Sequence, residues 1–174
     1  MTDTVLSQAL REAYAAAPAN VVIYHTLELR HPAFSSPIRV VRDYVDLTAT
    51  LESNAPVDAG ALVTFVRFVF DFTKPEVSSL GVPQITITMD NVDRAIVANI
   101  EAALITTDLV QVTYREYLST DLTQPQNNPP LNMTIMSVTA DVFKVTAVAG
   151  FPDLMNRRFP SIGYSAEVFP GLAA

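Results

Sequence analysis

Residues 61–72 constrain the fold more than any other stretch, because they are apolar at both even and odd positions. A strand places successive side chains on opposite faces, so its even and odd positions describe two surfaces. A strand that is apolar on both faces is covered on both faces. The sequence therefore predicts a strand packed between two layers of the protein.

The two faces of this strand lead to different expectations. The even face, with Phe68, Phe70 and Phe72, contains no charge and is expected to form the core of the subunit. The odd face mixes apolar and charged residues, which is more typical of a contact between subunits. The subunit contacts expected from this face are Val63, Phe65, Arg67, Val69 and Asp71.

Further segments with period-two alternation predict strands at residues 21–31, 38–45, 47–52, 84–89, 109–118, 131–135 and 143–147. Apolar residues at helical spacing predict a helix at about 4–16, with Thr4 as its N-cap, and another at about 91–104. The strand at 21–31 is expected to be half-buried, with its odd positions inside. The sequence thus predicts one α+β domain over residues 1–174, mostly antiparallel β. It has a β-rich core at about 21–148 and a C-terminal extension at about 150–174.

The composition excludes several classes of protein. Cysteine is absent, which excludes a disulfide scaffold, thiolate zinc sites and cysteine nucleophiles. The net charge of −7 argues against a surface that binds nucleic-acid phosphates. Charged residues make up only 17% of the chain, against about 25% in a typical protein. A surface short of charge is expected for a protein that packs against partners.

The residues that could carry chemistry favour structural roles. His25 and His31 lie on one predicted strand about 20 Å apart, too far to share a metal ion, so His25 is interpreted as a hydrogen-bonded core or interface residue. The aspartates at 43 and 46 indicate a solvated charge cluster, and those at 90 and 93 indicate helix capping. The serines lack a nucleophile-elbow context, and the scattered glycines form no phosphate loop. No catalytic residue, metal ligand or cofactor is therefore predicted.

Two polar segments provide further candidate contacts. Residues 119–130 contain a proline-rich polar stretch, which is either a simple linker or an arm that lies across a neighbouring subunit. If it is an arm, we expect it to be mobile in the free subunit and ordered only in the assembly. Arginines in the segment 156–160 can form bidentate contacts with carboxylates of a neighbour. The candidate contacts here are Gln124, Asn127, Asn128, Arg157 and Arg158.

Four segments resemble one known family: residues 17–32, 38–43, 125–131 and 153–160. In order and spacing they are similar to a family of small tail proteins of long-tailed bacteriophages, catalogued as a domain of unknown function. The resemblance implies a minor tail or distal-tail protein at the tail tip. It also implies a fold like that of the tail tube, in which packed β-sheets form a sandwich or barrel with a flanking helix and a long loop.

The function expected from this resemblance is that of a structural virion protein, not an enzyme. It would be made in the host bacterial cytoplasm and form a ring, as a hexamer or a trimer, between the tail tube and the tip or hub proteins. DNA would pass through the acidic lumen without specific binding, and no membrane is involved. The alternatives are a tail assembly or completion factor that is absent from the virion and, less favoured, a tail-associated hydrolase.

Overall fold

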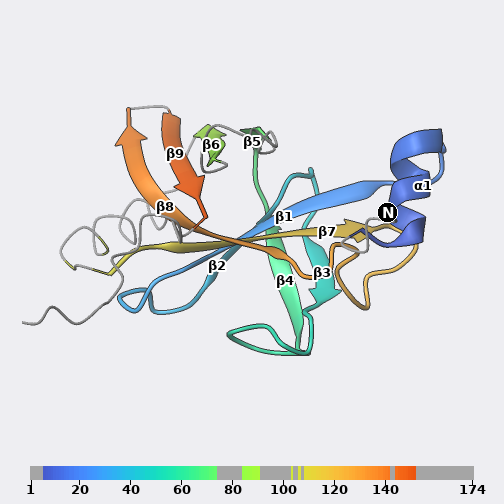
Figure 1. Cartoon of the computed structure of the whole chain (residues 1–174), viewed down its shortest axis with the longest axis horizontal. Helices are drawn as coiled ribbons and strands as arrows, with labels where there is room; N and C mark the ends of the chain where they lie inside the picture. Colours follow the sequence, from blue (N-terminus) through green and yellow to red (C-terminus); the bar gives the residue numbers. More distant parts are fainter. Residues whose placement is uncertain are drawn as a thin grey trace, which may run out of the picture.

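The computed structural model describes residues 6–73, 84–90, 103, 106, 108–141 and 144–151. These ranges contain one complete helix and nine strands of a single sheet (Figure 1). The elements are α1 (Gln8–Ala16), β1 (Ile23–Arg30), β2 (Ile38–Val41), β3 (Leu47–Thr50), β4 (Leu62–Arg67), β5 (Phe70–Thr73), β6 (Gln84–Asp90), β7 (Gln111–Leu118), β8 (Leu131–Ala140) and β9 (Lys144–Gly150).

The strand order in the sheet is β3-β4-β2-β1-β7-β8-β9-β6-β5. Every neighbouring pair is antiparallel except β2 and β4, which run parallel. The α+β class with a mostly antiparallel sheet is therefore confirmed. Each predicted strand is present, although the segment 38–45 ends as a strand at Val41 and the segment 61–72 is divided into two strands.

The sheet curls strongly around its main core. β4 and β5 lie near opposite ends of the strand order, yet only Phe68 and Val69 separate them along the chain. The two ends of the sheet must therefore approach one another. The predicted packing of sheet against sheet takes the form of one sheet folded over itself.

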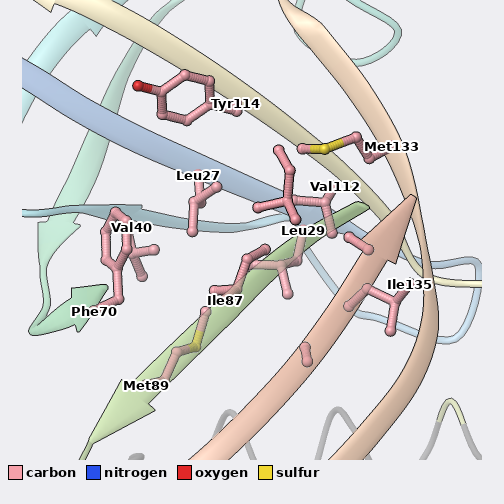
Figure 2. Close-up of a cluster of buried hydrophobic side chains, with 13 residues drawn as sticks. Leu27, Leu29, Val40, Phe70, Ile87, Met89, Val112, Tyr114, Met133 and Ile135 are labelled. Carbon is pink, nitrogen blue, oxygen red and sulfur yellow. The ribbon is translucent and has the colours of Figure 1, made fainter. Parts of the chain in front are cut away.

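Side chains from both halves of the sheet meet inside this curl. Leu27 of β1 and Val112 of β7 pack in one cluster with Ile87 of β6 and Ile135 of β8 (Figure 2). Each of these side chains is at least 92% buried. Burial of apolar surface at this scale is the main favourable contribution to folding.

Helix α1 packs at one end of the sheet (Figure 1) through a small separate cluster of Leu10, Ala13 and Leu118. The Ser7 side chain caps this helix by accepting a hydrogen bond from the backbone amide of Leu10 at 3.1 Å. The expected cap, Thr4, lies outside the described residues. The predicted helix at 91–104 also lies outside them except for Ala103, which is helical and buried, and so does nearly all of the predicted extension at 150–174.

Candidate interaction surface

In strand β4 the buried face and the exposed face are the reverse of the sequence prediction. Its odd positions Val63 and Phe65 point into a cluster with Tyr117 of β7, and Phe65 is fully buried. The ring centroids of Phe65 and Tyr117 lie 6.0 Å apart. Its even positions point outward, leaving Leu62 69% exposed and Val66 54% exposed. The expectation that Val63 and Phe65 contact another subunit is therefore wrong.

The buried side chains are at odd positions in β4 but at an even position in β5. The change occurs where the chain leaves one end of the sheet and enters the other. After Arg67 the backbone amide of Phe68 donates a hydrogen bond to the carbonyl of Val41, and Val69 is left exposed. The chain then resumes as β5, in which Phe70 is buried as predicted. Sequence alternation cannot reveal such a break, because apolar residues continue through it at Phe68 and Val69.

Exposed apolar side chains concentrate around β4. Of the ten large hydrophobic residues exposed in the described part of the chain, five lie on this strand, on the link between β2 and β3, or on the link between β4 and β5. We call this set the β4 surface; its members are Tyr44, Val45, Leu62, Val66 and Val69. A cluster of this kind on a folded subunit is typical of a site that contacts another protein.

A hollow of about 400 Å³ borders the β4 surface, and Tyr44, Phe68 and Val69 are part of its lining. Arg42 and Asp71 also line it and form an exposed ion pair at 3.4 Å.

Three of the predicted subunit contacts on this segment, Arg67, Val69 and Asp71, are exposed, as a subunit contact requires. Their role as subunit contacts stays a prediction. Alternation predicts Leu62 and Val66 on the core face, so it does not identify them as exposed. Tyr44 falls in the predicted strand 38–45, but the strand ends at Val41 and leaves Tyr44 on the link that follows.

Beneath this surface, the strand pair β1 and β7 buries charged side chains. Glu28 and Arg115 are completely buried, so the prediction that residues 21–31 form a half-buried strand is wrong. Arg39 donates to Glu28 at 2.8 Å, and Arg115 Nη1 lies 3.6 Å from Glu28 Oε2. Charges can be buried in this way only when they are paired.

The same arginines hold the loop between β3 and β4. Arg115 donates two hydrogen bonds to Glu52, at 2.7 and 2.8 Å, and Arg39 donates to Asp58 at 2.6 Å. Burial alone would raise the pKa of Glu52, but the hydrogen bonds from Arg115, a backbone hydrogen bond and the charges of Arg115 and Arg30 together outweigh it and leave that pKa below its ordinary value. These contacts are structural, since they join β1, β2, β7 and the loop between β3 and β4 through paired charges, although Arg115 Nη1 and Glu28 Oε1 make no hydrogen bond.

His25 belongs to a second polar group. Tyr114 donates its only hydroxyl hydrogen to Glu116, so the 2.8 Å contact with His25 Nδ1 requires the hydrogen to lie on that nitrogen. Tyr14 of α1 donates to the same carboxylate at 2.8 Å. Burial, reinforced by the charge of Glu116, raises the pKa of Tyr114 and keeps it neutral. His25 is thus a hydrogen-bonded, partly buried histidine, as predicted.

His31 is held in a comparable way. Its Nδ1 accepts a hydrogen bond from the backbone amide of Ala33, so its Nε2 carries the hydrogen and donates to the carbonyl of Asp108. His31 as a whole residue is 93% buried. This histidine ties the turn after β1 to the approach to β7.

The polar loop at 119–130 is fixed within the subunit. Asn127 is 3% exposed; its side chain donates to the carbonyl of Tyr114 at 3.1 Å and accepts from the amide of Glu116 at 3.0 Å. Gln126 pairs with the backbone of Glu116 and of Ser7. The expectation of an arm ordered only against a neighbour is therefore wrong, and Asn127 is not a surface contact. Gln124 and Asn128 are exposed, whereas Arg157 and Arg158 lie outside the described residues.

A family model described as a domain of unknown function, DUF1833, matches residues 9–164. The chain belongs to this family. No curated protein matches the chain. The family match spans all nine strands, so the β4 surface and the buried ion pairs both lie within the DUF1833 domain.

Two further findings concern the described part of this DUF1833 domain. Its His, Asp and Glu side chains form no group of three or more that could hold a metal ion. Within the same residues, no helix combines the length and the apolar character that a membrane span requires.

Proposed function

We propose that this chain is a structural subunit of a bacteriophage tail tip. It forms a ring with copies of itself and joins the tail tube to the tip or hub proteins. The observation that carries the proposal is the β4 surface, where Tyr44 is 88% exposed and Leu62 is 69% exposed. A surface of this kind is costly in a free subunit and is stabilised when a neighbouring protein covers it.

The resemblance of four segments to small tail proteins supplies the biological setting for this surface. Two of them, residues 17–32 and 38–43, cover β1 and β2, whose side chains build the core and the buried ion pairs. The resemblance therefore rests on residues that determine the fold. A tail of sixfold symmetry favours a hexamer, and a trimer fits a narrower tip.

The proposal also concerns the lumen that such a ring would form in the virion. The chain carries a net charge of −7, and a ring of such subunits favours a lumen that repels the phosphates of passing DNA. The repulsion acts over about 8 Å at physiological salt, so only side chains near the channel contribute. A lumen lined mainly by arginine and lysine would contradict this part of the proposal.

Mass spectrometry of phage particles purified through a density gradient tests the function. We expect the protein in intact particles at a ratio to the tail-tube protein that matches one ring per tail. Isolated tails should retain it, and a reconstruction by electron cryomicroscopy should place it at the tip. A protein present in the lysate but absent from particles would contradict the proposal and favour an assembly factor. Clearing of peptidoglycan in a zymogram would favour a hydrolase.

A further inference from the structure

Methionine is the source of sulfur in this chain, since the sequence has five methionines and no cysteine. Three of them lie in the described residues, on β6 and β8. Met89 is 5% exposed and Met133 is 1% exposed, and both belong to the main core (Figure 2). Met136, in contrast, is 53% exposed. Its thioether is therefore open to reagents in solution.

Met136 lies at an irregularity of strand β8. Ile135 pairs with Ala149 of β9, but the register then shifts, and Ser137 pairs with Val148. Met136 is thus the extra residue of a β-bulge, with no residue opposite it on β9. Met136 and Ser137 are both exposed, whereas a regular strand would expose only one of two successive residues.

The sulfur of Met136 lies in a defined place across β9. It accepts a weak hydrogen bond from Nε2 of Gln84 on β6 at 3.9 Å. It also rests against Gly150 of β9, where an added Cβ would come within 2.9 Å of the sulfur. One side of the thioether is therefore covered by β6 and β9, and more than half of the residue remains exposed.

A peroxide converts such a thioether into a sulfoxide. With hydrogen peroxide, a lone pair of the sulfur forms a bond to one peroxide oxygen, the O–O bond breaks, and water leaves. The sulfur is oxidised by two electrons and the peroxide is reduced by two. The sulfoxide oxygen is polar, whereas the thioether sulfur is only a weak acceptor. Nε2 of Gln84, already in contact with the sulfur, is a donor that this oxygen can use.

We propose that Met136 is a reversible oxidation site of this protein, with a peroxide as the reagent. Oxidation turns an apolar side chain on the exterior of β8 into a polar one and spares the methionines of the core. The fold is retained, because Met136 belongs to none of the three buried clusters of the described residues. Methionine sulfoxide reductases, one for each sulfoxide epimer, can reverse the reaction on the folded protein.

The rate of oxidation at each methionine of the folded, full-length protein tests the site. The protein is incubated with hydrogen peroxide, and the sulfoxide in each peptide is measured by mass spectrometry over time. We expect Met136 to react at least about tenfold faster than Met89 and Met133, because core side chains react only when the structure opens. In protein unfolded by urea, the matched control, the three rates should converge. Equal rates in the folded protein would overturn the proposal.

Thermal unfolding of the oxidised protein tests whether the site lies outside the core. Protein in which Met136 has been converted should keep its cooperative unfolding and a melting temperature close to that of untreated protein. Met136→Leu is the control, because it keeps an apolar side chain but lacks the sulfur. Cooperative unfolding that peroxide abolishes in the wild type but not in Met136→Leu would contradict the proposal.

Reversal is tested on the same oxidised sample without unfolding it. Both classes of methionine sulfoxide reductase, supplied together with a thiol reductant, should return the Met136 peptide to its original mass. A sulfoxide at Met136 that is reduced only after the protein has been unfolded would show that the site is not reversible in the native state.

Discussion

The strand pair β1–β7 and the strand pair β3–β4 differ in the face that lies opposite their apolar core face. Both pairs bury one apolar face, with Leu27 in the first and Phe65 in the second. On its other face, β1–β7 buries Glu28 and Arg115, whereas β3–β4 exposes Leu62 and Val66. The pair β1–β7 therefore buries charged side chains, which usually face solvent. The pair β3–β4 exposes apolar side chains, which are usually buried.

This difference separates a face that contacts within the chain cover from a face that they leave open. The buried charges of β1–β7 lie in ion pairs within the same chain, although Glu28 Oε1, Arg30 Nε and Arg115 Nη1 make no hydrogen bond. The outer face of β3–β4 has only threonines between its aliphatic side chains, such as Thr48 and Thr64, whose hydroxyls lie 3.3 Å apart. That face gains most by burial against another surface.

The largest effect on stability is expected from breaking the charged face of β1–β7. Arg115→Met should lower the free energy of unfolding by about 3–5 kcal/mol, because it leaves the fully buried Glu28 with fewer cations and removes both hydrogen bonds to Glu52. Urea unfolding followed by circular dichroism measures this loss. The double variant Glu28→Gln with Arg115→Met should recover part of the stability, since it removes the buried negative charge. A cost below about 1 kcal/mol for Arg115→Met would show that this face is not held by its ion pairs.

A smaller effect is expected where the polar loop crosses β7. Asn127→Ala should cost about 1–3 kcal/mol, because the carbonyl of Tyr114 and the amide of Glu116 lose their partner in a buried position. Hydrogen exchange at the amide of Gln126 should also become faster. The neighbouring Asn128→Ala is the control: Asn128 is exposed, so its loss should change stability by no more than about 0.5 kcal/mol. Equal effects for the two variants would contradict the assigned role of Asn127.

Much of the fold follows from alternation alone, because strands at the surface of a core repeat with period two. β1, β3, β6, β7 and β9 appear where their patterns place them. Alternation fails at Phe68 and Val69, because two apolar residues interrupt the strand without any polar signal, and it therefore predicts the exposed face of β4 as core. It also fails where charges are buried. The pairing of Glu28 with Arg115 and Arg39 depends on contacts across three strands, which no local pattern in one strand contains.

A still smaller effect concerns pH. The pKa of folded Glu52 lies below the ordinary value of 4.5, so this group stabilises the fold above that pH and the contribution is lost as the pH falls through the folded pKa. The variant Glu52→Gln should therefore unfold more readily than the wild type at neutral pH, and the difference should shrink in acid. Glu12→Gln on the exposed side of α1 serves as the control. A difference that stays constant from neutral to acidic pH would contradict the ion pair with Arg115.

The most direct test of the division between core and assembly surface uses two adjacent residues of β4. Phe65 is fully buried and Val66 is 54% exposed, and they point to opposite faces of the strand. The same substitution at each, Phe65→Asp and Val66→Asp, is compared by thermal unfolding and by light scattering. We predict that Phe65→Asp abolishes cooperative unfolding, whereas Val66→Asp keeps the melting temperature of the isolated subunit and prevents assembly. A folded but monomeric Phe65→Asp together with a normally assembling Val66→Asp would contradict the account.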